Sequence, residues 1–475
     1  MISGPLVKSV RLSTILGGDT RLEASTYLRD GYGFVRLANQ CKNHVRLGDL
    51  ADIWQPSRLT GYTMPDGKGL PFFTAGQVFE DFPRVRKWLA APFVPQADTR
   101  YVKQDWLLLS CSGVVGNITA VYPHHLDKII THDLLRIVPK DASEYGWLYA
   151  YMKTNFFKQI AQAAQYGHMI KHIEVSHASE FPIIMPENDV RKTIGETARR
   201  AVLLRSKSWK MRDEAFSTLE KHVGACRDSA TQAQAASQGE VSLAAILQNR
   251  LRLDADSFVG AIKDVDELID ACDWDYLGIL TSDVVEPTRF KRFYGESDVP
   301  FVGISELFDV NAQPTKHVYP KLIKGYQQFM LEPGTLVMAR SGQKYGILGR
   351  ALKITENHRG MMGSDHLTRI YPDETKLRSG YLLAFLNDPL IGRPSVIRHA
   401  FGTSIPELAP TDIKRIRIPR LGDTNEKSIA DLMDKSVRMS AEADRLENEA
   451  TRLAQEQIDL AIAQLSDDKW IAYAR

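Results

Sequence analysis

Two short stretches have residue types that could transfer a methyl group or bind a nucleotide. An adenine methyltransferase needs an Asn/Asp-Pro-Pro-aromatic motif to hold the flipped base, and a glycine-rich loop for its methyl donor. The nearest match, NDPL at 387–390, lacks the second proline and the aromatic residue. A P-loop has the pattern GxxxxGK[ST]. GYTMPDGKG at 61–69 has one residue too many and no hydroxyl after Lys68. Neither stretch predicts an enzyme.

Acidic, histidine and cysteine residues are equally poor candidates for hydrolysis or metal chemistry. A PD…ExK nuclease needs its acids separated by a strand, whereas PDETK at 372–376 crowds them into one turn. His124 and His125 have no further ligands at zinc-site spacing, so we expect an exposed loop. Cys111 precedes a Ser-Gly turn, and a buried structural thiol is the favoured interpretation. We therefore expect no catalytic residue, no metal and no cofactor.

Bulk composition is typical of a globular protein of several domains. The 475 residues are 44% apolar and 25% charged. The formal net charge is only +2, so local patches must meet any anionic partner. Four scattered cysteines without a CxxC pair suit a reducing compartment. No signal-peptide core or membrane-length apolar run is visible, and we expect a cytoplasmic protein.

The sequence repeats itself at an offset of about 230 residues. RLEASTY at 21–27 matches RLDADSF at 252–258, and LPFFTAGQVF at 70–79 matches VPFVGISELF at 299–308. Further pairs in the same order are the Ser-Gly turns at 112–113 and 341–342, HDLLRIVP with SDHLTRIYP, GWLYAYM from Gly146 with GYLLAFL from Gly380, Tyr166-Gly167 with Phe401-Gly402, and FPIIMP with IRIP. An ordered series of this kind predicts two copies of one domain.

Each copy ends in a predicted long helix, which at 1.5 Å per residue and about 35 residues makes a rod of roughly 50 Å. From Asn425 to Arg475 there is no glycine or proline. One face of this helix steps by four and three, as a heptad seam does: Leu432, Ser436, Met439, Ala443, Leu446, Ala450, Leu453, Gln457 and Leu460. The corresponding face of the first helix is Ile194, Ala198, Ala201, Leu204, Ser208, Met211, Ala215 and Leu219. Two such helices favour mutual antiparallel pairing over packing on their own domains.

The globular part of each copy mixes short β runs with helical stretches, so the predicted fold class is α+β. We expect two similar globular domains joined by two long antiparallel coiled-coil helices, with an internal pseudo-twofold repeat. The predicted segments are an N-terminal segment 1–44, a first domain 45–186, a first long helix 187–224, a linker and repeat-start segment 225–274, a second domain 275–421 and a second long helix 422–475. The polar stretch 225–240 predicts a flexible connector.

These motifs, in their duplicated order, resemble the specificity subunits of type I restriction–modification systems. Such subunits have two target-recognition domains, each followed by a long helix. The shared features are an apolar-Pro-Phe strand, a Ser-Gly…Gly turn, an aromatic helix, a glycine loop and a closing Ile/Pro strand. The resemblance covers roughly 45–224 and 275–465. The first 44 residues depart from many members, and they pair only with 252–274.

The resemblance implies a non-catalytic DNA sequence-recognition subunit. Each domain would read one half of a split double-stranded DNA target. The helices would set the gap between the halves and dock two N6-adenine DNA methyltransferase subunits, and through them an ATP-dependent restriction and translocation subunit. Because the two copies differ at most loop positions, we expect a non-palindromic target with two unlike halves.

The Ser-Gly turns and glycine loops are the predicted DNA contacts. Such turns offer backbone N–H groups and a hydroxyl to a phosphate, and polar side chains can reach base edges. The predicted DNA-binding residues are Ser112, Gly113, His168, Lys171 and His172 in the first copy, and Arg340, Ser341, Gly342, Gln343, Lys344, Tyr345, Arg398, Thr403 and Ser404 in the second. The competing interpretation is that the turns are hairpins that need glycine only for a positive φ.

Two other functions are open at this stage. One is a DNA-binding adaptor of another phage-defence assembly, which co-purifying subunits would reveal. The other is a protein-binding scaffold that no longer reads DNA, which suits the near-neutral charge. A steep salt dependence of DNA affinity would oppose the scaffold. A methyltransferase on the same chain is opposed by the missing motifs.

Overall fold

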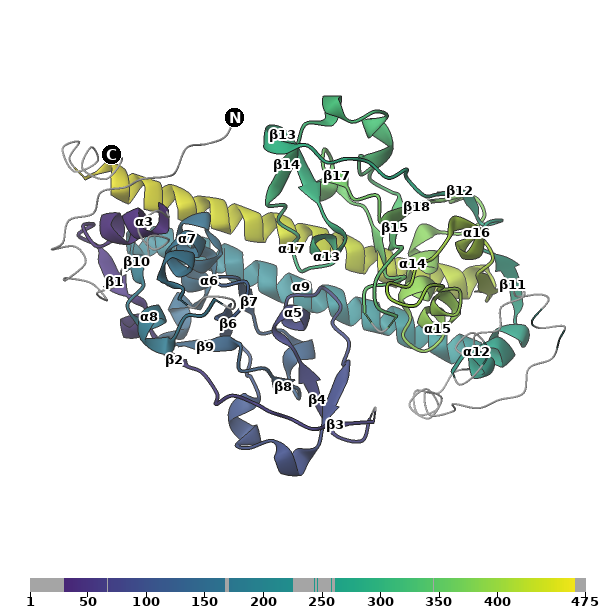
Figure 1. Ribbon diagram of the computed structural model, residues 1–475, viewed down its shortest axis with the longest axis horizontal. Helices are drawn as coiled ribbons and strands as arrows, with labels where there is room; N and C mark the ends of the chain where they lie inside the picture. The colour runs from purple at the N-terminus through teal and green to yellow at the C-terminus, as the bar shows by residue number, and fades with distance from the viewer. Residues whose placement is uncertain are drawn as a thin grey trace. The chain divides into compact units, whose positions relative to one another are not determined.

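The computed structural model describes residues 30–65, 67–166, 171–224, 243, 246, 258, 261–344 and 346–465 (Figure 1). RLEASTY, the first six residues of RLDADSF and the connector 225–240 lie outside them. The chain forms two compact units. Unit 1 combines residues up to 79 with 87–204 and those from 443, and unit 2 combines 80–86 with 205–442. Each unit takes half of both long helices, so the units divide the chain differently from the segments expected from the sequence.

Both units contain the same antiparallel four-stranded sheet. In unit 1 the order is β2-β9-β6-β7, formed by Ala51–Trp54, Leu134–Pro139, Leu107–Ser110 and Ile118–Ala120. In unit 2 the order is β12-β18-β15-β16, formed by Thr281–Val285, Leu367–Pro372, Leu336–Ala339 and Ala351–Lys353. Matching strands come from matching stretches of the repeat, so the duplicated α+β fold is confirmed.

Of the remaining strands, all but β3 have a counterpart in the other unit. The apolar-Pro-Phe stretches are β4 (Leu70–Phe73) and β13 (Tyr294–Val302). Each pairs with one strand antiparallel and another parallel: β5 (Lys87–Leu89) and β8 (Ile129–Ile130) in unit 1, β14 (Lys316–Val318) and β17 (Met362–Gly363) in unit 2. A two-residue strand, β3 (Thr63–Met64), joins β5. The closing strands β10 (Pro182–Ile184) and β19 (Arg417–Arg420) pair with β1 (His44–Arg46) and β11 (Asp273–Tyr276).

Helices occupy equivalent places in the two units. In unit 1, α3 (Asp30–Ala38) packs on α7 (Asn155–Ala164), which follows α6 (Tyr145–Lys153). In unit 2, α12 (Ala261–Asp270) packs on α15 (Gly392–Ile397), which follows α14 (Ser379–Asn387). The short helices are α4 (Leu47–Leu50), α5 (Ala75–Val78), α8 (Val175–Ser179), α13 (Ile304–Leu307) and α16 (Pro410–Ile413). The expected correspondence between the N-terminal segment and residues 252–274 thus includes α3 and α12, which take the same place in the two units.

The two long helices are α9 (Asn188–Val223) and α17 (Asp423–Ala463) (Figure 1). Unit 1 holds the first half of α9 and the last half of α17, and unit 2 holds the opposite halves, as antiparallel helices require. In unit 2, Arg205 Nη1 donates to Ser440 Oγ at 3.4 Å. The predicted face of α9 is confirmed, since six of its members are buried and Leu204 and Met211 are half-buried.

The predicted seam of α17 is wrong beyond Ala450. Leu453 and Gln457 are only half-buried and Leu460 is 56% exposed. The buried residues there are instead Ala454, Ile458 and Ile462. A straight α-helix drifts relative to a strict heptad, because 3.6 residues per turn do not divide seven evenly. The buried stripe therefore moves by one position.

His125 and Cys111, which were considered above as candidates for metal binding and nucleophilic chemistry, are both buried. The expected exposed loop is wrong for His125, whose Nδ1 accepts from Tyr122 N at 3.1 Å and whose Nε2 donates to Val78 O at 3.1 Å. Burial lowers the pKa of His125 to about 3, so this histidine is neutral at pH 7. Cys111 is buried as predicted, and burial raises its pKa to about 12.

Neither a metal site nor a membrane span is found within the described ranges. No three His, Cys, Asp or Glu residues there are grouped so that they could hold a metal ion. No helix there is long and apolar enough to cross a bilayer.

An arginine is buried at the same place in each four-stranded sheet. Arg136 on β9 donates to the backbone oxygens of Thr131, Leu134 and Ile130 at 2.6–2.9 Å and of Arg100 at 3.4 Å. Arg369 on β18 donates to the oxygens of Ser364, Leu367 and Phe329. Burial lowers the pKa of each guanidinium to about 10, so both stay charged at pH 7. Each arginine ties its central strand to the preceding loops.

The glycines that open the duplicated aromatic helices lie against the long helices. A Cβ at Gly146 of α6 would stand 2.0 Å from the backbone oxygen of Gly195 in α9. A Cβ at Gly380 of α14 would stand 2.7 Å from the oxygen of Ala430 in α17. Only glycine permits this approach, which explains why the repeat retains it.

Gly146→Ala is expected to lower the free energy of unfolding of unit 1 by about 1–3 kcal/mol, because backbone must move to admit the methyl group. Gly33→Ala is the matched control. Gly33 lies within α3 and its Cβ would meet nothing within 4 Å, so alanine should stabilise by about 0.5–1 kcal/mol. Hydrogen exchange of α6 and α3 would measure both effects. Equal exchange in the two variants would contradict the proposed close contact.

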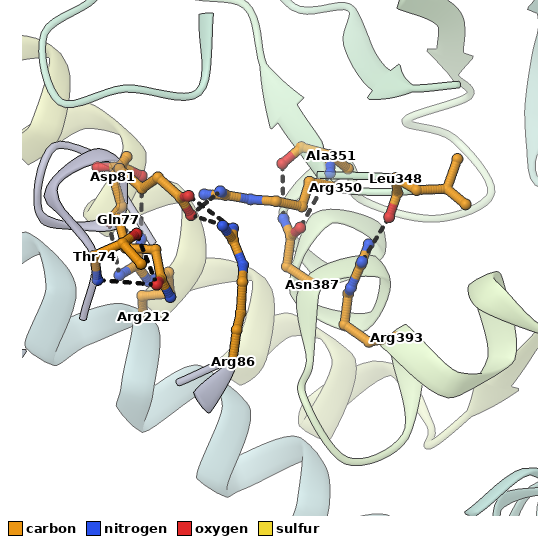
Figure 2. A network of polar contacts seen from close by, with 11 residues as sticks. Thr74, Gln77, Asp81, Arg86, Arg212, Leu348, Arg350, Ala351, Asn387 and Arg393 are labelled. Carbon is orange, nitrogen blue, oxygen red and sulfur yellow. Dashed lines mark hydrogen bonds and ion pairs between the residues drawn. The ribbon is translucent and has the colours of Figure 1, made fainter. Parts of the chain in front are cut away.

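Seven residues of the first copy, Glu80–Arg86, belong to unit 2; we call them the strap. Glu80 accepts from Arg86 at 2.7 Å and from Arg350 at 3.0 Å, and Figure 2 labels these two arginines. Asp81 accepts from Trp209 Nε1 at 3.0 Å and from Arg212 at 3.2 Å. These ion pairs are largely shielded from water. The strap is therefore held by specific ion pairs rather than by non-specific electrostatic attraction.

The strap also approaches a buried carboxyl in unit 2. Arg84 Nη2 donates to Asn387 O at 3.0 Å, beside Asp388. The Asp388 side chain accepts from the N–H groups of Leu390 and Ile391 at 3.0 and 2.7 Å, and so shapes the turn between α14 and α15. Burial, with a smaller contribution from Glu220, raises the pKa of Asp388 to about 7. NDPL at 387–390 is therefore a structural turn in this chain.

Candidate nucleic-acid interface

In unit 1 the Ser-Gly turn and the glycine loop are joined. Ser112 and Tyr166 both form an antiparallel bridge with His172, and Gly113 N donates to Lys171 O at 3.0 Å. The turn itself is fixed by Ser110, whose Oγ donates to Val114 O at 2.6 Å. Gly113 has a φ of 72°, a conformation that favours glycine. Two loops predicted separately therefore form one surface.

Unit 2 repeats this arrangement with different side chains. Ser341 and Phe401 both bridge Glu407, and Gly342 N donates to Pro406 O at 3.1 Å. Phe401 and Glu407 exchange backbone hydrogen bonds of 2.9 and 2.7 Å. A tight hairpin thus runs from Phe401 to Glu407 and lies against the Ser-Gly turn. The backbone frame is shared by the two copies, whereas the residues displayed on it are not.

The tip of the unit 2 hairpin carries the exposed candidates. Thr403 and Ser404 are exposed after Gly402, which has a φ of 95°. Ile405 beside them is 64% exposed. Gln343 on the neighbouring turn is exposed too. Hydroxyls and an amide on a rigid hairpin can hydrogen-bond to base edges or phosphates.

Two predicted arginines lie at the base of the surface. Arg340 is 6% exposed and pairs with Glu286 and, at 2.6 Å, with Glu407. Arg398 pairs with Asp266. Ser341 is also buried, and its Oγ lies 2.8 Å from His366 Nδ1. In this conformation these side chains hold the turn and hairpin in place rather than project from them.

The other predicted residues differ in how far the structure describes them. Lys171 and His172 of unit 1 and Lys344 of unit 2 are half-buried. His168 and Tyr345 lie outside the described residues. Sequence reasoning missed Glu286, His366 and Glu407, which fix the unit 2 turn. No local sequence signal marks them, because their partners lie 25–67 residues away.

Comparison with known proteins gives similarity to solved structures only. The chain is similar to the crystal structure of a type I restriction–modification system S subunit from M. genitalium, at 14% identity, covering 88% of this chain and 94% of that one, with a TM-score of 0.34. It is similar to a chain from a study of complex assembly and conformational transition of the type I R-M system, at 12% identity, 88% and 97% coverage and a TM-score of 0.27.

A third similar structure is the HsdS subunit from Thermoanaerobacter tengcongensis, at 13% identity, 89% and 96% coverage and a TM-score of 0.25. No protein-family model and no curated protein matches the chain.

Proposed function

We propose that this chain is the DNA sequence-recognition subunit of a type I restriction–modification complex or a related methyltransferase complex. Each globular domain reads one half of a bipartite, asymmetric target. The chain contributes no catalytic residue. Its partners are double-stranded DNA and N6-adenine DNA methyltransferase subunits, and in a restriction complex also an ATP-dependent translocase.

The observation that supports this proposal most strongly is the duplicated site. Each unit presents a Ser-Gly turn bridged to a hairpin loop on the same frame, but with different residues: His172 in one and Glu407 in the other. The two units have the same loop backbone but different side chains on it, which suits the reading of two unlike DNA sequences. A scaffold without DNA binding gives no reason for two such matched loop pairs.

The long helices are proposed to set the spacer and to dock the methyltransferases. At 1.5 Å per residue, the 36 residues of α9 and the 41 of α17 correspond to rods of about 54 and 62 Å. Half-sites read from one face of DNA lie about one helical turn, or 34 Å, apart. Rods of this length can hold two domains over neighbouring turns.

The decisive experiment is long-read methylome sequencing of cells that express this chain together with its neighbouring N6-adenine methyltransferase. We expect a split N6-methyladenine motif with two unlike halves, absent from cells that lack this chain. The methyltransferase alone is the control. Methylation that persists unchanged without this chain would refute the recognition role, and a palindromic motif would refute the two unlike halves.

A further inference from the structure

Unit 2 contains a cavity of about 480 Å³ whose chemistry the paired loops do not explain. It lies between the loop after β12 and two 3₁₀ turns, Pro320–Leu322 and Tyr326–Phe329. Its cations are Arg289, Lys291 and Lys324. No carboxylate occurs among the described residues that line it. The lining therefore carries three positive charges and suits an anion.

The walls of this basic pocket are fixed, whereas its two lysines are exposed. Thr288 donates through its N–H and its hydroxyl to Gln328 Oε1 at 3.3 and 3.4 Å, which ties the loop to the second turn. The Phe290 ring packs on Phe329 with a centroid distance of 4.1 Å. Lys291 and Lys324 are exposed, and neither has an ion-pair partner within the part of the chain that the structure describes.

The basic pocket adjoins the candidate interface. Arg289 is 75% exposed, and its Nη2 lies 4.0 Å from Glu407 Oε1. Glu407 is the residue that bridges the Ser-Gly turn to the hairpin. A ligand that extends from the base of the hairpin toward the loop after β12 would therefore meet Arg289 first and the two lysines beyond it.

The first copy keeps the frame of the pocket but only one of its three cations. QPSRLT at 55–60 aligns with EPTRFK at 286–291, so Arg58 corresponds to Arg289 and Thr60 to Lys291. Pro95 corresponds to Lys324, since Gln96 and Gly325 after them share a left-handed backbone with φ of 51° and 65°. Both lysines are thus particular to unit 2, and the frame does not require them.

We propose that the basic pocket of unit 2 is a DNA-backbone anchor that binds a phosphodiester next to the bases read by the Phe401–Glu407 hairpin. Arg289, Lys291 and Lys324 neutralise the phosphate, and the Phe290 and Phe293 side chains pack against the adjoining sugar. The anchor rests on the proposed function. It makes the two domains unequal, because unit 2 holds the DNA backbone with two more cations than unit 1.

The test uses the full chain in complex with its methyltransferase subunits. Affinity for a duplex that carries the methylated motif, and for an unrelated duplex, is measured over a range of salt concentrations. Lys291→Thr and Lys324→Gln should each weaken binding to both duplexes. The double variant should reduce the salt slope by about 1, since the three cations together neutralise one phosphate. The methylated motif should stay the same. Lys321→Gln is the matched control, because Lys321 is exposed on the Pro320–Leu322 turn, three residues before Lys324, but does not line the pocket.

Three results would overturn the anchor. The first is a double variant that keeps the wild-type salt slope. The second is an equal loss of DNA affinity in Lys321→Gln, which would indicate that any surface lysine in this region contributes by its charge alone. The third is lysine-dependent binding of a free mononucleotide or inorganic phosphate together with an unchanged DNA slope. Failure of the proposed function looks different: the wild-type complex would then show no preference for any motif, whatever the lysines do.

Discussion

Arg136→Met is expected to lower the free energy of unfolding of unit 1 by about 3–5 kcal/mol. The substitution leaves buried backbone oxygens of Thr131, Leu134 and Ile130 without their donor, and each such oxygen costs about 1–3 kcal/mol. Methionine fills much of the same volume, so the loss reports on the missing hydrogen bonds rather than on a cavity. Total stabilities are only about 5–15 kcal/mol, so a large part of unit 1 should open.

Hydrogen exchange resolved along the chain is the appropriate measurement, because a chain with two units need not unfold in one step. Arg369→Met should produce the same loss in unit 2 and spare unit 1. Arg46→Met is the surface control, because Arg46 pairs with Asp49 and Glu180 where water screens the charges, so little change is expected. If β6 and β9 of Arg136→Met were protected from hydrogen exchange as well as in the wild type, the stabilising role of the Arg136 hydrogen bonds would be contradicted.

The double substitution Thr403→Ala/Ser404→Ala is expected to relax one half of the methylated motif. Both hydroxyls lie exposed at the tip of the Phe401–Glu407 hairpin. A lost contact to a base edge costs about 1–3 kcal/mol of discrimination, or roughly 5- to 150-fold. The methylome of the variant should therefore accept other bases at one or two positions of a single half-site. The half read by unit 1 should be unchanged.

The matched control is Ser282→Ala/Thr375→Ala, which removes two exposed hydroxyls of unit 2 that donate to Tyr371 O and Asp373 rather than belonging to the hairpin. Its motif should be that of the wild type. If the hairpin variant keeps full stringency in both halves while it remains folded, the hairpin tip does not read bases. Relaxation spread over both half-sites would point instead to a general loss of affinity.

The duplicated fold could be predicted because it depends on local patterns that occur twice in order. Gly146 and Gly380, or Arg136 and Arg369, recur at matching places, and each has a packing role that explains its recurrence. The burial of His125 could not be predicted. Its partner is Val78 O, 47 residues away, and nothing beside the two histidines signals it.

The candidate surface was predictable in its backbone but not in its charge. Glycines with positive φ and the Ser-Gly turns mark the loops in the sequence, whereas the ion pairs of Arg340 with Glu286 and Glu407 depend on tertiary contacts. Those contacts hold the Arg340 side chain at the base of the hairpin. The strap was equally invisible, because its partners in unit 2 lie 128–303 residues away.

The strap limits which segments of this chain can be replaced by segments of another chain. Glu80–Arg86 are encoded within the first domain, yet their partners Trp209, Arg212 and Arg350 belong to unit 2. A graft of residues 45–186 from another chain would import a foreign strap and leave Arg212 and Arg350 without their carboxylates. Functional chimaeras should therefore retain the resident strap or transfer its partners with it. A graft that preserves the contacts of unit 2 therefore needs a discontinuous set of residues rather than a single continuous segment.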